Sequence, residues 1–271
     1  MKNSLLRLLV RCYPFSRGKT RLSNIAKRHV SGFILSEDQS GHQMLLDLDQ
    51  YIDSHIYIDG AYETECLDLI SKTATVFKIN FFFDIGANLG AYTLHFASLP
   101  LIERVYAFEP DPRNFAKLQA NLMLDDKLEK VTTYNVALSN KNDPSVPFYI
   151  SRQRSNNEMN KIGGGTSSLE FNQKRHTVSS SQTVPVWRLD SLVDLSSEKV
   201  AIKIDVEGHE LAVLEGMSKL LRHNQCVLMV ESFGSKYSEV HDFLEKAGFK
   251  LHRHFEHQEN YLYIPKDEKF R

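Results

Sequence analysis

From about residue 76 the sequence alternates between short apolar runs and stretches with apolar residues at helical spacing. Strands are predicted for the runs NFFFDIG, RVYAFEP, VTTYNVAL, VAIKIDVEG and CVLMVES, and for two closing runs, FKLHRHF and YLYIP. Helices are predicted between them, over residues 88–98, 112–124, 210–221 and 236–247. Strands that alternate with helices form a mostly parallel sheet covered on both faces. We therefore expect a doubly wound α/β domain over residues 76–271.

Residues 1–75 lack this rhythm, and we expect them to form an N-terminal extension of helices and strands that caps the domain. VSGFIL and QMLLDLD predict strand pieces around the turn-rich SEDQSGH, and a helix is predicted over residues 64–73. Leu5, Leu8 and Leu9 have helical spacing. They predict an amphipathic helix that packs on its own domain, with a helix lying on a membrane surface as the alternative.

Between residues 139 and 184 the alternation gives way to Asn, Ser, Gly and basic residues. One hairpin is predicted there, with VPFYI pairing with TVPVWRL. Residues 151–183 form an insert that is either a functional lid or a surface loop, since long loops in compact domains are usually one or the other.

Composition and charge limit the classes of binding partner and the cellular location that we expect. The chain of 271 residues has a formal net charge of −1, which gives no general attraction to nucleic acid. Arg7 and Arg11 interrupt what would be the apolar run of a signal peptide, and no segment has the length of a membrane span. The three cysteines form no CxxC pair, so a reducing cytoplasm is the expected location. Nothing in the sequence specifies an oligomeric state.

The turn after the first strand of the domain indicates a cofactor site. Asp84 ends the strand, and the chain turns through Gly86 and Gly90 into a helix. A dinucleotide-binding GxGxxG would need a glycine at Asn88, so a nicotinamide cofactor is disfavoured. A carboxylate at Asp84 would repel a pyrophosphate but can hold the ammonium group of S-adenosylmethionine. Glu109 ends the next strand, where an acid can accept both ribose hydroxyls; the alternative is that both acids cap helices.

Several motifs in order resemble the FkbM-type methyltransferases, which use S-adenosylmethionine and mostly methylate hydroxyl oxygens of sugars and natural products. The motifs are FDIGANLGAYTLHFA, VYAFEPDPRNFAKLQANL, NVALSN, VPVWRLDSL and IKIDVEGHELAVLEG. The resemblance implies a Rossmann-like sheet of seven strands. It also implies cofactor-binding positions at Asp84, Gly86, Asn88, Gly90 and Glu109, with Ala137 and Leu138 near the adenine.

A second acidic turn, KIDVEGHE, follows another predicted strand. Methyl transfer to a hydroxyl requires a base beside that hydroxyl, in line with the methyl group. Asp205 is the first candidate for this base and Glu207 its partner or a substrate ligand, while His209 is an alternative base because its unperturbed pKa is about 6.5. The sequence has no fixed metal-ligand spacing, so no residue is assigned to a metal. Magnesium held by Asp205, Glu207 and Glu231 stays an alternative.

The acceptor is expected to be a small molecule or a glycan. Substrate contacts are predicted at Glu63 and Glu231, and at Thr166, Ser167 and Ser168 in the GTSSL segment that resembles family members. The expected function is an S-adenosylmethionine-dependent O-methyltransferase acting on a sugar, glycan or small natural product. Two alternatives remain: a non-catalytic protein that binds the cofactor or a glycan on the same fold, and a nicotinamide oxidoreductase.

Overall fold

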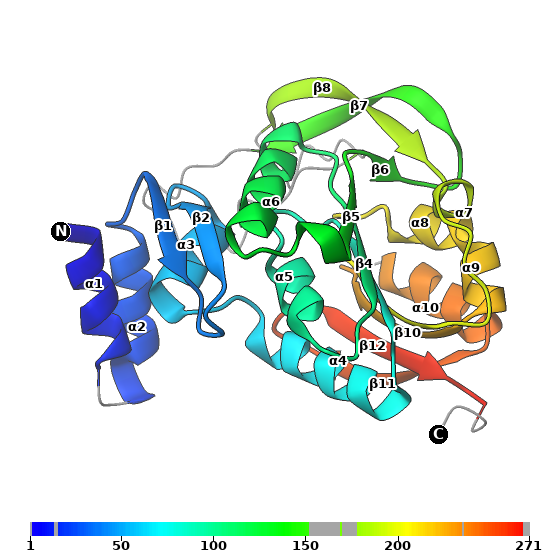
Figure 1. Cartoon of the computed structure of the whole chain (residues 1–271), viewed down its shortest axis with the longest axis horizontal. Helices are drawn as coiled ribbons and strands as arrows, with labels where there is room; N and C mark the ends of the chain where they lie inside the picture. Colours follow the sequence, from blue (N-terminus) through cyan, green and yellow to red (C-terminus); the bar gives the residue numbers. More distant parts are fainter. Residues whose placement is uncertain (1, 14–15, 152–168, 170–177, 235, 268–271) are drawn as a thin grey trace.

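A computed structural model describes residues 2–13, 16–151, 169, 178–234 and 236–267. Its centre is a seven-stranded sheet with the order β11-β12-β10-β9-β3-β4-β5 (Figure 1). The five strands β10, β9, β3, β4 and β5 are parallel, and β12 and β11 are added antiparallel at one edge. The strands are β3 (Phe81–Ile85), β4 (Arg104–Phe108), β5 (Val131–Tyr134), β9 (Lys199–Ile204), β10 (Gln225–Glu231), β11 (Phe249–Phe255) and β12 (Asn260–Pro265). The predicted mostly parallel seven-stranded sheet is confirmed.

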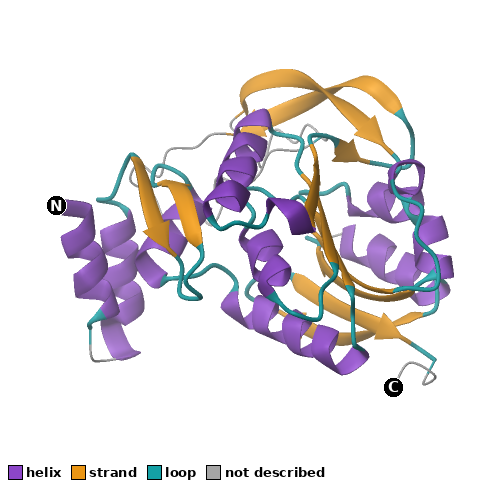
Figure 2. Ribbon diagram, in the orientation of Figure 1, coloured by secondary structure: helices purple, strands orange, loops and turns teal. Residues whose placement is uncertain are grey.

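Helices cover both faces of this sheet (Figure 2). Alternate residues of β3 enter different cores, with Phe82 in one hydrophobic cluster and Phe83 in the other. The first core receives α4 (Thr64–Phe77), α5 (Ala91–Ser98) and α6 (Pro112–Leu124). The second receives α7 (Leu189–Leu192), α8 (Glu210–Gly216), α9 (Ser218–His223) and α10 (Lys236–Lys246). A short 3-10 turn, η1 (Leu128–Lys130), leads into β5.

The N-terminal part of the chain joins the first core. It consists of α1 (Lys2–Arg11), α2 (Ser16–Lys27), the hairpin β1 (Phe33–Glu37) and β2 (Gln43–Asp47), and α3 (Tyr51–Asp59). The two predicted strand pieces are confirmed, but α3 was not predicted. The first helix packs on its own domain as predicted, but through Leu6 and Val10; Leu5, Leu8 and Leu9, whose spacing led to the prediction, are exposed.

A second, smaller sheet has the order β6-β8-β7 and its own hydrophobic cluster, which includes Phe148 and Val184. Its strands are β6 (Ala137–Leu138), β7 (Asp143–Ser151) and β8 (Val178–Trp187). The antiparallel pairing of β7 with β8 confirms that a hairpin forms here, but VPFYI pairs with residues 180–184 and meets the predicted partner TVPVWRL only at Thr183 and Val184. The predicted insert or lid at residues 151–183 lies mostly outside the described residues.

Two predicted helices differ from the observed ones. The helix expected from residue 88 begins at Ala91, because Asn88 and Gly90 have positive φ angles of 51° and 95° and still belong to the turn. The helix expected over residues 210–221 is divided into α8 and α9 at Met217. In the part of the chain that the structure describes, no helix is long and apolar enough to cross a membrane.

Candidate active site

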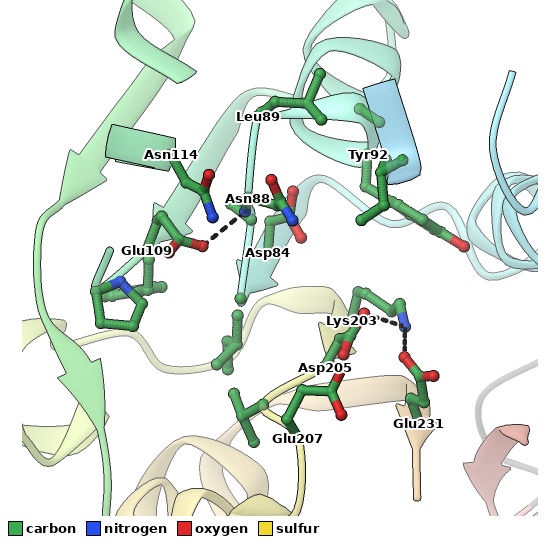
Figure 3. A pocket seen from close by; sticks show the side chains of 18 of the residues that line it. Asp84, Asn88, Leu89, Tyr92, Glu109, Asn114, Lys203, Asp205, Glu207 and Glu231 are labelled. Atoms are coloured by element: carbon green, nitrogen blue, oxygen red, sulfur yellow. Dashed lines mark hydrogen bonds and ion pairs between the residues drawn. The ribbon is translucent and has the colours of Figure 1, made fainter. Parts of the chain in front are cut away.

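A cavity of about 760 Å³ lies at the carboxyl ends of the parallel strands, the edge where open α/β sheets bind ligands (Figure 3). Each of four neighbouring strands contributes an acid. Asp84 lies near the end of β3, Glu109 directly after β4, Asp205 directly after β9 and Glu231 at the end of β10. The parallel register thus brings together acids that are far apart in the sequence.

The glycine turn is closed by contacts that depend on its residue types. A Cβ atom added to Gly86 would lie 1.9 Å from the backbone oxygen of Asp205, so no side chain fits where the two acidic turns touch. Asp84 is buried and accepts hydrogen bonds from the hydroxyl and the backbone N–H of Thr93, in the first turn of α5. Its predicted alternative, a helix-capping role, therefore holds in part. Burial raises the pKa of Asp84 to about 6.

Glu109 has a different arrangement. One carboxylate oxygen accepts a hydrogen bond from the backbone N–H of Asn88 and the other from that of Asp111, both at 2.8 Å. The cap of α6 is not Glu109 but Asp111, whose side chain accepts from the backbone N–H of Arg113. Glu109 is thus held in place facing the cavity, and its burial raises its pKa to about 8.

At the other end of the cavity the acids converge on a buried lysine. The Nζ atom of Lys203 lies 3.6 Å from Asp205, 3.8 Å from Glu231 and 3.9 Å from Glu63, and it donates a hydrogen bond to Asn260 at 3.0 Å. Figure 3 shows Lys203 between Asp205 and Glu231, across the cavity from Glu109. Because Lys203 is beside Asp84 in the β3–β9 register, it also faces the glycine turn.

The charges in this cluster shift one another's pKa values. Burial favours the neutral amine of Lys203, but the carboxylates of Asp205, Glu63 and Glu231 outweigh that effect and raise the pKa of the lysine above its ordinary value. Burial and the neighbouring acids raise the pKa of Glu231 well above its usual range, and burial also raises that of Glu63. One ammonium thus shares three acids, and Glu63 and Glu231 keep their protons to higher pH than they would in water.

The interpretation of these acids as magnesium ligands is not supported. Asp205 and Glu231 surround Lys203, whose ammonium already occupies the position of a cation. Among the described residues, no group of three or more His, Cys, Asp or Glu side chains is arranged to hold a metal ion.

The remaining residues of the second acidic turn have distinct positions. Glu207 has a positive φ of 54° and lines the cavity. His209 also lines it, and its Nε2 atom is 2.9 Å from the hydroxyl of Ser139. Glu210 begins α8 and accepts a hydrogen bond from the backbone N–H of Gly208, while burial raises its pKa to about 7. Asp205 and Glu207 are thus the acids of this turn that face the cavity.

The N-terminal part supplies one wall of the cavity. Glu63, predicted as a substrate contact, is buried and accepts a hydrogen bond from the Tyr92 hydroxyl at 3.0 Å. Tyr51 and His55 of α3 line the same wall with Tyr62. Ala137 and Leu138 also line the cavity, as does Leu169. The predicted substrate contacts at Thr166, Ser167 and Ser168 lie outside the described residues.

Sequence reasoning missed Lys203, Tyr92 and Asn260. A lysine inside the apolar run VAIKI was the available signal, because a charge in a strand buried on both faces needs partners. Tyr92 and Asn260 had no such signal. The amide of Asn260 donates to Glu63 across 197 positions of sequence, a contact that only the fold creates.

The doubly wound sheet and the cavity at its strand ends define a Rossmann-like α/β fold. The family described as the methyltransferase FkbM domain matches residues 84–251, more than half of the chain. The protein therefore belongs to the FkbM methyltransferase family, and the predicted resemblance is confirmed. The family implies S-adenosylmethionine as the methyl donor.

The chain is also similar to individual proteins. Methyltransferase sdnD of Sordaria araneosa is 27% identical over 229 residues, covering 75% of this chain and 83% of that protein. Hexuronic acid methyltransferase AglP of Haloferax volcanii is 29% identical over 168 residues, covering 60% of this chain and 61% of that protein. The crystal structure of methyltransferase FkbM from Methylobacillus flagellatus has a TM-score of 0.46 at 17% identity, covering 69% of this chain and 44% of that chain.

Proposed function

We propose that the protein transfers a methyl group from S-adenosylmethionine to a hydroxyl of a sugar, glycan or small natural product. The observation that carries the proposal is that one cavity joins the Glu109 carboxylate to the acid cluster around Lys203. A hydroxyl acceptor needs a nearby base, and the cluster offers carboxylates. The name of AglP, a hexuronic acid methyltransferase, supports a sugar acceptor.

The cavity residues fit the cofactor. Both Glu109 oxygens already accept one backbone N–H each, and each retains a lone pair for a ribose hydroxyl. Asp84 would face the cofactor's ammonium group, with Gly86, Asn88 and Gly90 forming the turn beside it. Ala137 and Leu138 would provide apolar contacts to the adenine. When bound, S-adenosylmethionine supplies its methyl group on a positively charged sulfur.

Asp205 is proposed as the base. Its side chain is 28% exposed, against 15% for Glu231 and 4% for Glu63, so it is the acid beside Lys203 with most access to the cavity. Asp205 would take the proton of the acceptor hydroxyl as that oxygen bonds to the methyl carbon and the bond from carbon to sulfur breaks, its electron pair remaining on sulfur. Lys203 would hold the carboxylate in place. Glu207 would orient the acceptor, with Glu63 and Glu231 completing its site, and His209 stays the alternative base.

Electrostatics supports a positively charged cofactor at this position. Six acidic residues line the cavity, and Lys203 is the one lysine or arginine among its described lining residues. A sulfonium group would offset part of this negative charge.

The described cysteines, Cys12, Cys66 and Cys226, are free thiols, which supports the proposed location in a reducing cytoplasm.

Methyl transfer itself tests the proposal. The protein would be incubated with S-adenosylmethionine labelled in its methyl group and a panel of free sugars and uronic acids, and the labelled product analysed by NMR. A new methyl ether is the expected product. A methylated nitrogen or carbon would contradict O-methylation. If the methyl ether forms, Asp205→Asn should lower its turnover about 100-fold or more while cofactor binding persists. Equal turnover in wild type and Asp205→Asn would exclude Asp205 as the base.

A further inference from the structure

The outer surface of the two N-terminal helices combines exposed leucines with positive charge. In α1, Leu6 and Val10 pack into the first core, whereas Leu5, Leu8 and Leu9 are 59%, 58% and 51% exposed. These three residues have the spacing i, i+3, i+4, so they form one stripe on the solvent side of the helix. A folded monomer has no internal reason to expose three leucines in one stripe.

The adjoining helix α2 continues this surface with charge. Arg21, Ile25 and Arg28 are exposed at positions i, i+4 and i+7, and Lys19 is exposed as well. The helices α1 and α2 contact each other and both contact α3. Figure 1 shows them side by side at the end of the molecule remote from β10, β11 and β12. We call Leu5, Leu8, Leu9, Arg21, Ile25 and Arg28 the basic-apolar face; Lys19 is a further exposed cation of α2 that lies outside this stripe.

The charged residues at the start of the chain are all basic. Residues 1–36 contain eight Lys and Arg residues and no Asp or Glu, although the whole chain carries 33 basic against 34 acidic residues. Some of these cations are used within the fold: Lys27 pairs with Asp59 at 2.8 Å, and Arg7 donates to Ser36 and to the backbone oxygen of Glu37. Lys19, Arg21 and Arg28 are exposed and add to the positive field.

We propose that the basic-apolar face docks the protein on an anionic phospholipid membrane. Helices of this kind lie in the plane of the bilayer interface, where leucines enter the acyl boundary and basic side chains contact lipid phosphates. A second copy of the chain is the weaker occupant, because pairing two such faces would bring like charges together. Docking would hold the cavity near the bilayer, since α3 contacts both helices and also lines the cavity. The proposal does not depend on the proposed methyl acceptor.

Vesicle flotation tests this docking on the full chain. One set of vesicles contains phosphatidylglycerol and phosphatidylcholine in equal amounts, and the other phosphatidylcholine alone. The protein is expected to float with the anionic vesicles and less so at high salt. The triple variant Leu5→Ser, Leu8→Ser, Leu9→Ser should lose at least about tenfold in partitioning. Reversal of Lys19, Arg21 and Arg28 to Glu should lose on the order of a hundredfold.

Matched controls change exposed residues elsewhere. Val76, Met123 and Leu128 are large exposed apolar residues outside the face, and their change to Ser should leave flotation unaltered. Lys72→Glu, Lys246→Glu and Lys250→Glu serve as the charge control. Circular dichroism and the melting temperature check that all variants fold.

Three results would overturn the proposal. The first is that wild-type protein does not float with anionic vesicles. The second is that the controls lose as much binding as the variants of the face. The third is a dimer, detected by light scattering, that the leucine variant disperses, since the face would then belong to a second copy of the chain.

Discussion

Removal of the Lys203 ammonium is the most revealing perturbation of the site. In Lys203→Met the stem of the side chain is nearly preserved, but the Asp205, Glu63 and Glu231 carboxylates lose the cation within 4 Å that they share. Lys203 is 2% exposed and Glu63 is buried as well, so little water can take the place of the ammonium beside Glu63. Breaking a buried ion pair by removing one partner costs about 3–5 kcal/mol. For a protein of this size, that loss lowers the melting temperature by on the order of 10 °C.

The pH dependence of the stability lost in Lys203→Met shows whether the missing charge causes the loss. The raised pKa of Lys203 means that the wild-type lysine stabilises the fold below its unfolded pKa, throughout the neutral range, and loses this effect only as pH rises through its folded value. Glu63 and Glu231 have raised pKa values even with Lys203 present, and the lysine is a cause that lowers them, so its removal should make both acids still harder to ionise as pH rises. The stability lost by substitution should therefore be greater at about pH 8 than at about pH 5.

Urea unfolding of wild type and Lys203→Met at both pH values measures this difference. Lys199→Met is the control, because Lys199 is at the other end of the same strand and is only half-buried. The control should lose less than about 1 kcal/mol. A loss for Lys203→Met that matches the control, or that is equal at both pH values, would refute the assignment of Lys203 as the shared counter-ion of the cluster.

Three further predictions concern the cavity. Burial raises the pKa of Glu109 to about 8, so its carboxylate forms mainly between about pH 6 and pH 9. The affinity for S-adenosylhomocysteine, measured by calorimetry, should rise over this range. Glu109→Gln should abolish the rise and lower the affinity about tenfold or more. Gly86→Ala should destabilise the fold by about 3 kcal/mol or more, whereas Gly208→Ala, with positive φ but open space, should cost about 1 kcal/mol in the same urea assay. Asp205→Asn should lower kcat about 100-fold or more, with S-adenosylhomocysteine affinity changed less than about threefold, and comparable losses in both would contradict its role as base.

Much of the sheet could be predicted because its strands are short apolar runs separated by amphipathic helices. The same regularity places Asp84, Glu109, Asp205 and Glu231 at the ends of parallel strands, so their convergence on one edge follows from topology. The helix α3 was less predictable. Its sequence YIDSHIYID has apolar residues on most sides, since Ile56, Tyr57 and Ile58 are all buried, and so it lacks a helical stripe.

The partners of Lys203 show what a linear pattern omits. A lysine in a buried strand needs acids, but the sequence does not say which ones. Glu63 reaches it from the turn before α4, where it has a positive φ of 49°, and Asn260 from the first residue of β12. The exposure of Leu5, Leu8 and Leu9 was likewise hidden, because the stripe that packs inward is the one containing Leu6 and Val10.

Calorimetric titration of the full chain tests whether the cavity binds S-adenosylmethionine through Glu109. S-adenosylhomocysteine and NAD would be titrated separately into wild type and Glu109→Ala, with Glu103→Ala as a surface control near the start of the preceding strand. We expect S-adenosylhomocysteine to bind to wild type and to the control, this binding to be lost in Glu109→Ala, and NAD to bind more weakly or not at all. No binding of S-adenosylhomocysteine, or tighter binding of NAD, would contradict this expectation.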